Sequence, residues 1–429
     1  MLFRFSLYGF LKNQRYYEPF LILAFLDKGM SFFEIGVLVG FREICVNVME
    51  VPTGAIADVV GRRRSMIFSF LGYIVAFVTF ALAREVWLFF PAMFFFSIGE
   101  AFRTGTHKAI IFDWLARQGR AGEKTKVYGF TRSWSKMGSA LSALIAPVLV
   151  IVFANYSVIF LACLLPYTAN IVNFLTYPAY LDGPRKRHGS VKAVMVTLAA
   201  SFRDTVRSRP LRRLIAESMG FEGVFKVSKE FLQPVVKSAA LALPLFVGLG
   251  WGKVQRTAVL IGVVYAALHL LSSFASRHAD TLARRSGSEE KGARWLWVMD
   301  FAAFGVLTGG VLAGVPGVAI IAFISLAVIQ NFWRPMLISR FADRSDPEKQ
   351  ATLLSIESQA KSLFAAAILP VMGLLADNIP HLARRVAPSL GLSAETSADT
   401  WRFLPIGLLG MVMAGAMLVM RPSAKPDEA

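Results

Sequence analysis

Long apolar segments recur along nearly the whole chain and are separated by short polar stretches. A helix needs about 20 mostly apolar residues to cross roughly 30 Å of hydrocarbon, and each segment is close to that length. The segments cover residues 5–27, 34–57, 65–83, 87–113, 128–153 and 156–178, then 213–244, 255–275, 294–313, 316–339, 351–376 and 402–420. We therefore expect an all-α polytopic membrane protein with twelve transmembrane helices.

One long polar break divides the two series of six. It predicts an N-terminal bundle at 1–180, a cytoplasmic linker at 181–212 and a C-terminal bundle at 213–429, two pseudo-symmetric bundles of six helices. The first apolar segment contains Lys12, Arg15 and Glu18 and lacks a small-residue cleavage site. It is therefore expected to be a retained helix rather than a cleaved signal. The polar segment at 377–400 is expected outside the membrane, with no assigned role.

Composition supports the membrane class, because 55% of the residues are hydrophobic and only 17% are charged. The two cysteines, Cys45 and Cys163, both lie in apolar segments. Neither a disulfide framework nor a cysteine metal site is expected from such positions. The sequence predicts no cofactor and no bound metal.

The distribution of basic residues predicts the orientation. With the N-terminus inside, the inside loops and ends carry 27 Lys and Arg, and the outside loops carry 6. Basic residues in short loops are retained on the cytoplasmic side. Both termini are therefore expected in the cytoplasm, with the protein in the cell (inner) membrane. This asymmetry accounts for most of the net charge of +18 and predicts contact with anionic lipids at the cytoplasmic face, not with nucleic acid.

A short motif is repeated at equivalent places in the two halves. "GAIADVVGRRRSM", Gly54 to Met66, follows the second predicted span, and "SRHADTLARRSG", Ser276 to Gly287, follows the eighth. The aligned copies both read Ala-Asp-x-x-small-Arg-Arg. A carboxylate beside a helix N-terminus and nearby arginines can hold one packing of two helices. We predict a conformational latch formed by Gly54, Asp58, Gly61, Arg62, Asp280 and Arg284.

The first copy, Gly54-x-x-x-Asp58-x-x-Gly61-Arg62-Arg63, resembles the loop signature of the major facilitator superfamily. In the second copy Ser276 and Ala283 replace the two glycines. The resemblance implies two six-helix bundles that rock about a central site and expose it to each side in turn. The whole pattern is closest to the drug-efflux-like branch, which implies export. The stretch Gly138 to Pro147 is similar to the antiporter signature of the family but lacks its glycines.

Charged side chains recur inside the spans at three- or four-residue spacing, which places them on common helical faces. Each costs at least about 2.5 to 3.5 kcal/mol at mid-membrane unless it is paired or hydrated. In the resembled family, the spans that carry them line the central cavity. Single pairs, such as Glu357 with Lys361, would equally serve to tie helices together. As a set they predict a solvated substrate and proton pathway of Arg15, Glu18, Glu43, Glu50, Glu100, Arg103, His107, Arg132, Lys136, Glu222, Lys226, Arg334, Glu357 and Lys361.

The interior groups number nine acids and eleven bases, a slight basic excess. It favours a carboxylate, a phosphate or a zwitterion as the small-molecule substrate. "GLGWGK", Gly248 to Lys253, is one residue short of a phosphate-cradling loop and lacks the following Ser or Thr. An ion gradient is therefore expected to drive transport, with Glu18, Glu100 and Glu222 as proton carriers and His107 as a fourth candidate.

These observations predict a monomeric secondary active transporter that exports a small organic solute in exchange for protons. The alternative is proton-coupled uptake or facilitated transport of an anionic or zwitterionic metabolite. A membrane enzyme would need an acid and a base such as His107 and Asp113. These lie six residues apart, on opposite helical faces, with no nucleophile or metal-ligand spacing nearby. An enzyme is therefore not expected, and a sensor that binds without transport is a further alternative.

Overall fold

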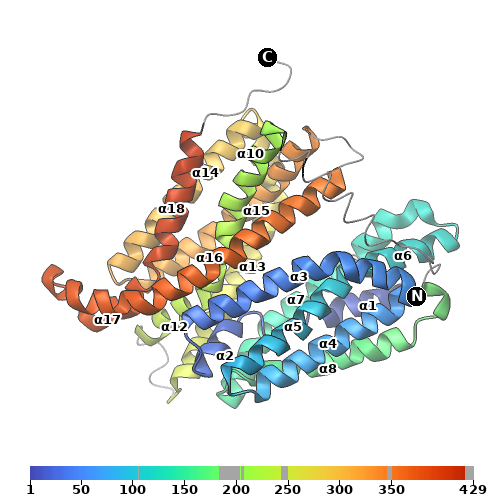
Figure 1. The fold of residues 1–429 in the computed structure, drawn as a ribbon, viewed down its shortest axis with the longest axis horizontal. Helices are drawn as coiled ribbons and strands as arrows, with labels where there is room; N and C mark the ends of the chain where they lie inside the picture. The colour runs from blue at the N-terminus through green and yellow to red at the C-terminus, as the bar shows by residue number, and fades with distance from the viewer. Residues whose placement is uncertain (105, 183–202, 204–206, 243–249, 345–349, 421–429) are drawn as a thin grey trace. The chain divides into compact units, whose positions relative to one another are not determined.

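The computed structural model describes residues 1–104, 106–182, 203, 207–242, 250–344 and 350–420 (Figure 1). It describes no side chains at positions 51, 54, 55, 58, 59, 125, 279, 280, 283 and 351. The described residues form helices and turns and no strand. The chain separates into two compact units. Unit 1 contains Met1–Met30 and Leu38–Val196, and unit 2 contains Ser31–Val37 and Thr197–Ala429.

Unit 1 is built on long helices around an aromatic core. Its helices are α1 (Leu2–Lys12), α2 (Leu21–Asp27), most of α3 (Phe32–Val60), α4 (Arg62–Leu82), α5 (Val86–Arg103), α6 (Thr106–Arg117), the 3₁₀ turns η1 (Ala121–Glu123) and η2 (Ala179–Asp182), α7 (Lys124–Phe153) and α8 (Val158–Leu175). Helix α4 packs against α5 and α8, and α1 packs against α7 and α8 (Figure 1). The buried rings of Phe80 and Phe160 lie 5.4 Å apart in this core.

Unit 2 begins with a helix that changes its winding. Its elements are α10 (Arg209–Ser218), the π-helical turn η3 (Met219–Gly223), α11 (Val224–Glu230), α12 (Leu232–Ala242), α13 (Lys253–Arg285), α14 (Glu289–Leu312), α15 (Pro316–Ala342), α16 (Gln350–Val386), η5 (Ala387–Leu390), α17 (Ala394–Trp401) and α18 (Leu404–Val419). Helix α14 packs against α15 and α18, and α13 packs against α12 and α15.

Each predicted span corresponds to one helix or to consecutive helices among the described residues. Eight of these elements are long and apolar enough to cross a membrane, or nine if α17 and α18, which meet at a 46° bend, form one span. The expectation of an all-α membrane fold is confirmed. The first, second and seventh predicted spans are missing from this set. They are the spans interrupted by turns or rich in charged residues.

The first predicted span is not one helix, contrary to the prediction. Helix α1 ends at Lys12 and α2 begins at Leu21, and the residues between them form turns. Pro19 explains the interruption, because proline has no N–H to donate and disfavours a helical conformation at the preceding Glu18. Arg15 and Glu18 therefore lie in these turns and not on a helical face.

Three other segments differ from the predicted boundaries. Helix α13 continues to Arg285, so the second copy of the repeat is helical and the turn follows at Gly287, whose φ is 79°. Helix α15 continues past the predicted end, so Arg340 is a buried helical residue and not a loop residue. Much of the segment at 377–400 is helical, because α16 extends to Val386 and α17 follows. The predicted linker lies largely outside the described residues.

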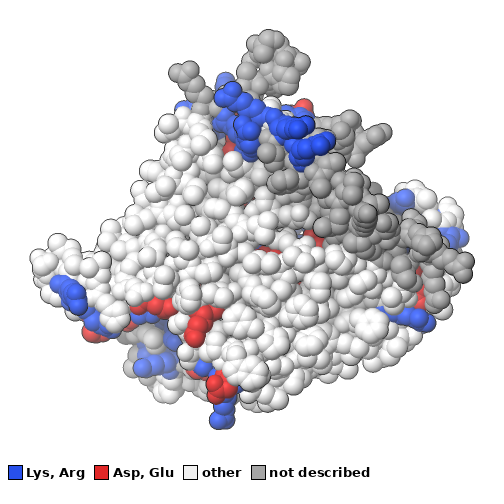
Figure 2. Space-filling model, in the orientation of Figure 1, with Lys and Arg blue, Asp and Glu red and all other residues white. Residues whose placement is uncertain are grey.

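The surface in Figure 2 is almost free of charged side chains along its flanks. Large apolar side chains are exposed along the helices, among them Leu165 and Val412. Lys and Arg gather instead at one end of unit 2 (Figure 2). Exposed bases at this end, where α10 and α14 begin and α13 ends, are Arg207, Arg209, Arg212, Arg284, Arg285, Lys291 and Arg294. Apolar flanks and a basic end suit a helix bundle surrounded by lipid.

Candidate functional site

A cavity of about 400 Å³ lies among α1, α5, α6 and α7 of unit 1. This volume is within the range of small-molecule sites. The charged residues of its wall are all basic, and none of the lining residues is acidic. The basic residues are Lys12, Arg103, Lys108, Arg132 and Lys136. The charged side chains of the cavity wall are therefore all positive.

One face of α7 supplies much of this wall. Arg132 and Lys136 are four residues apart, and Thr131, Ser135 and Ser139 follow the same helical spacing. Close packing of α1 and α7 positions this face. A β-carbon at Gly138 would stand 2.3 Å from the backbone oxygen of Phe10, so only glycine fits there.

His107 and Tyr8 form an aromatic pair in the cavity wall. Their ring centroids are 3.8 Å apart, and the His107 side chain is buried. The Nε2 atom of His107 has no hydrogen-bond partner among the described residues. A buried polar atom without a partner, in a residue that lines a cavity, is a candidate contact for a ligand.

Arg103 reaches the cavity from a half-buried polar triad with Glu100 and Tyr73. It forms an ion pair with Glu100, and its Nε atom donates to the Tyr73 hydroxyl at 3.1 Å. The Tyr73 hydroxyl in turn donates to Glu100 Oε1 at 2.5 Å. Glu100 thus neutralises the charge of Arg103. The other four basic residues of the wall form no ion pair within the part of the chain that the structure describes.

Unit 2 contains a second charge cluster, in which the buried carboxylates Glu222 and Glu357 meet the half-buried bases Arg334 and Lys361. Arg334 donates to both oxygens of Glu222 at 3.1 Å and to Glu357 Oε1 at 2.9 Å. Lys361 donates to Glu222 Oε2 at 2.7 Å and to Glu357 Oε1 at 3.2 Å. Two acids and two bases therefore balance. Glu357 is fully buried, and Ser218 also donates to it.

The π-helical turn η3 carries Glu222 into this cluster. Single π-helical turns are frequent at functional sites. Lys226, on the next helical turn, donates to the Ser362 hydroxyl of α16 at 2.9 Å. The structure thus brings all five predicted pathway residues of unit 2 onto facing sides of η3, α11, α15 and α16.

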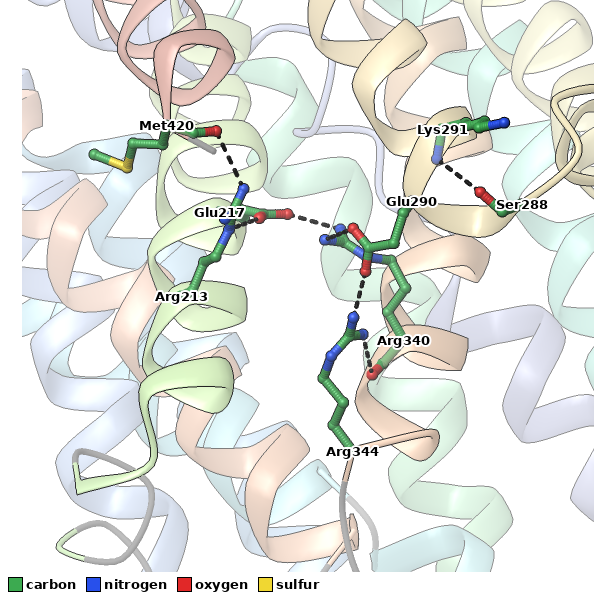
Figure 3. Close-up of polar contacts among 8 residues, drawn as sticks. All are labelled: Arg213, Glu217, Ser288, Glu290, Lys291, Arg340, Arg344 and Met420. Carbon is green, nitrogen blue, oxygen red and sulfur yellow. Dashed lines mark hydrogen bonds and ion pairs between the residues drawn. The ribbon is translucent and has the colours of Figure 1, made fainter. Parts of the chain in front are cut away.

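A third network lies at the basic end of unit 2 (Figure 3). Arg340 donates to Glu217 Oε2 at 2.7 Å and, through two atoms, to both oxygens of Glu290 at 2.9 and 3.0 Å. Arg344 donates to Glu290 at 2.6 Å, and Arg213 donates to Glu217 at 2.8 Å. Sequence reasoning missed this network as a unit because it assigned Arg340 to a loop. The sequence does contain one indication of the network, because Arg340 and Arg344 are four residues apart at a helix end and so share one face.

The remaining predicted pathway residues in unit 1 lie apart from the cavity. Arg15 and Glu18 are 3.8 Å apart, and 55% of the Glu18 side chain is exposed. Glu43 pairs with the neighbouring Arg42 at 2.9 Å. Glu50 is half-buried on α3. Neither Glu43 nor Glu50 is among the residues that line the cavity.

The predicted latch is described only in part. The side chains of Asp58 and Asp280 and position 54 fall outside the described residues, so these assignments stay predictions. At Gly61, whose φ is 110°, α3 gives way to α4. Asp182, from η2, accepts a hydrogen bond from the backbone N–H of Arg63 at 3.1 Å. No local sequence pattern pointed to Asp182 as the acid at this helix N-terminus, since the two residues are 119 positions apart.

His107 and Asp113 do not form a pair. His107 stacks on Tyr8, whereas Asp113 pairs with Arg117 at 3.0 Å one turn further along α6. No group of three or more potential metal ligands lies close together in the described residues.

Comparisons with known proteins agree on one family. The model of the Major Facilitator Superfamily matches residues 13–370. The fold is similar to that of the nucleoside transporter NupG, with a TM-score of 0.75 and 13% identity over 97% of this chain and 98% of that one. It is also similar to a bacterial homolog of the human lysosomal transporter Spinster, with a TM-score of 0.69 and 14% identity over 97% and 95%. A D-xylose-proton symporter gives a TM-score of 0.61 and 14% identity over 98% and 97%. No curated protein matches the sequence.

Proposed function

Because this chain belongs to the Major Facilitator Superfamily, we propose that it is a secondary active transporter that moves a small organic solute by alternating access. The observation that carries the proposal is the cavity of unit 1, because four of its five basic side chains lie in helical segments long and apolar enough to cross a membrane. Such side chains are costly in lipid unless water or a ligand reaches them. A solvated path accounts for their position.

Proton coupling is the proposed energy source. Glu100 and Glu222 each bind a basic residue of the same unit, Arg103 and Arg334 respectively. A proton on either carboxylate would release its arginine and so change the charge that a solute meets. Glu18, largely exposed and 3.8 Å from Arg15, is the weakest of the three proposed carriers.

The resemblance to efflux proteins favours export, and exchange of the solute for protons remains a proposal. The positive charge of the cavity favours the alternative, proton-coupled uptake of an anionic or zwitterionic metabolite. A proton on Glu100 would free Arg103 for an anion, so proton and anion would bind together. Joint binding is the pattern of symport, whereas competition is the pattern of antiport.

The basic end of unit 2 supports placing that end in the cytoplasm, against anionic lipids of the cell (inner) membrane, and the excess of basic residues in the predicted inside loops supports the same side for both termini. The proposal takes a monomer as the working unit.

Cysteine labelling tests the solvated path. In a Cys45→Ser/Cys163→Ser background, single cysteines at Ser135 and Ser139 are expected to react with a membrane-impermeant maleimide in sealed vesicles. Val148, on the same helix α7 and 56% exposed, is the matched control. A cysteine there is expected to face lipid and to react slowly. Equal, slow reaction at all three positions, from both sides of the membrane, would contradict the proposal.

Proteoliposomes test coupling and direction. A panel of organic acids, sugars, peptides and cationic drugs is offered under a pH gradient of either sign, and both solute and internal pH are followed. Solute moving with protons supports uptake, and solute moving against them supports export. Glu100→Gln is expected to abolish the dependence on the gradient, whereas Glu123→Gln in the exposed η1 turn is expected to leave it unchanged.

A further inference from the structure

The cavity of unit 1 holds more positive charge than the protein itself neutralises. Arg103 is paired with Glu100, but Lys12, Lys108, Arg132 and Lys136 have no ion-pair partner within the described residues. They converge from α1, α6 and α7. Lys108, Arg132 and Lys136 are exposed and Lys12 is half-buried, and like charges gathered around one cavity repel. An anion in the cavity would remove this repulsion.

His107 points independently to a ligand. Its side chain is more than nine-tenths buried, the residue lines the cavity, and its Nε2 atom has no hydrogen-bond partner among the described residues. The Tyr8 ring packs against the imidazole at a tilt of 33°, which restricts the orientation of the imidazole. A buried nitrogen without a partner is costly, and a bound hydrogen-bonding group would offset that cost.

We infer that this cavity binds a small soluble phosphate monoester. Arg132, Lys136 and Lys108 face its phosphate, and His107 contributes a hydrogen bond. A phosphate monoester carries roughly −1.5 to −2 charge at neutral pH and three terminal acceptor oxygens. A monocarboxylate, with one negative charge, would leave most of the four basic residues unbalanced. The inference rests on the proposed transport function, because it takes the ligand to be the transported solute. Binding itself can be measured without transport.

The size of the cavity agrees with this class. About 400 Å³ is enough for a phosphate with a short organic body and too little for a nucleotide chain or a peptide of several residues. The aromatic rings of Phe5, Tyr8 and Tyr128 in the same wall would contact the organic part.

Titration calorimetry on the full chain in nanodiscs of neutral phosphatidylcholine tests the inference. The probe is glycerol 2-phosphate, and glycerol, its uncharged parent, is the control ligand. Binding of the phosphate and none of glycerol is expected. Arg132→Gln/Lys136→Gln is expected to weaken binding at least tenfold, because it removes two charged contacts.

Lys124→Gln/Lys126→Gln is the matched control variant. It removes two basic residues from the same helix α7, but neither residue lines the cavity. Affinity is expected to change less than threefold. An equal loss in both double variants would show a general charge effect and overturn the site. If the cavity variant does not fold, Lys108→Gln, at an exposed position, replaces it.

Two further arms separate the sources of the anion. Succinate tests the class, and tighter binding of succinate than of glycerol 2-phosphate would overturn the phosphate assignment. Phosphatidylglycerol in the nanodisc tests a lipid headgroup as the source. If this lipid occupies the cavity and glycerol 2-phosphate does not bind in neutral discs, the assignment of a soluble ligand is overturned.

The outcome is separate from that of the proposed function. Binding of glycerol 2-phosphate without its movement into proteoliposomes would support the site and count against transport. Movement of another solute by a chain that does not bind the phosphate would support transport and overturn the site.

Discussion

The carboxylate of Asp182 lies so close to Gly61 that a β-carbon at position 61 would stand 2.7 Å from its Oδ1 atom. Glycine is required there for a second reason, because φ is 110°. The carboxylate accepts hydrogen bonds from the first backbone N–H groups of α4, where the helix dipole favours negative charge. The glycine of the repeated motif therefore creates space for an acid that lies elsewhere in the chain.

Gly61→Ala is expected to destabilise the protein by about 2–5 kcal/mol, from backbone strain and the collision with Asp182. Gly119→Ala is the matched control, because Gly119 also has a positive φ, 66°, but open space around it. It is expected to cost only about 1–2 kcal/mol. Thermal unfolding in detergent measures both, and equal shifts would show that the Asp182 contact adds nothing.

Gly138→Ala is expected to separate α1 from α7 and destabilise the protein by about 1–3 kcal/mol, since its methyl group would meet the Phe10 backbone oxygen. Gly129, on the same helix α7, has open space instead. Gly129→Ala is expected to raise stability by about 0.5–1 kcal/mol through better helix propensity. Shifts in melting temperature of opposite sign are the result to look for. A stabilising Gly138→Ala would contradict the close packing.

The hydrophobic pattern predicted where the helices lie, because membrane thickness fixes their length. It did not predict where they break. The interruption before Leu21 follows from Pro19. The prediction of one continuous span used the apolar length of the segment and gave this proline no weight. The π-helical turn at Met219–Gly223 has no comparable signal, since its residues would also fit a regular helix.

The candidate site was predictable where its members share a helix. Arg132 with Lys136 and Glu357 with Lys361 are four residues apart, and periodicity alone places each pair on one face. Partners on different helices were not predictable. The position of Asp182 at the start of α4 results from tertiary packing, which cannot be read from a single sequence. Lys12 and Lys108 also lie within predicted spans, but only the packing of α1 and α6 places them around the same cavity.

Arg334→Gln is expected to destabilise unit 2 by about 3–5 kcal/mol, because it leaves two buried carboxylates to share Lys361. Adding Glu357→Gln restores the charge balance and is expected to recover much of the loss. A double-mutant cycle by thermal unfolding measures this coupling. Arg384→Gln is the control, since its pair with Glu395 is exposed and is worth about 0–1 kcal/mol. Additive losses in the cycle would exclude a shared cluster.

Arg340→Gln is expected to cost about 3–5 kcal/mol, because Glu217 and Glu290 both lose a buried partner. Arg344→Gln removes one ion pair with Glu290 and a hydrogen bond to the Arg340 backbone carbonyl, and is expected to cost about 1–2 kcal/mol. Chemical unfolding of the two variants gives the comparison. A larger effect at Arg344 would place the centre of the network elsewhere.

His107→Phe keeps a ring against Tyr8 and removes the nitrogen that lacks a partner. We expect stability to change by less than about 1.5 kcal/mol, as for other volume-conserving changes. Affinity for glycerol 2-phosphate is expected to fall about 3–10-fold, the value of one lost hydrogen bond. Calorimetry and thermal unfolding on the same sample separate the two effects. Unchanged affinity would remove His107 from the site.

The π-helical turn sets the rotational phase of its helix. A regular α-helix turns about 100° per residue, so deleting one residue within Met219–Gly223 would rotate Arg213 and Glu217 by about that angle relative to Glu222. Glu217 serves the network around Arg340, and Glu222 serves the cluster around Arg334. The π-helical turn therefore orients Glu217 and Glu222 toward two different charge clusters, in directions that a regular α-helix would not give them.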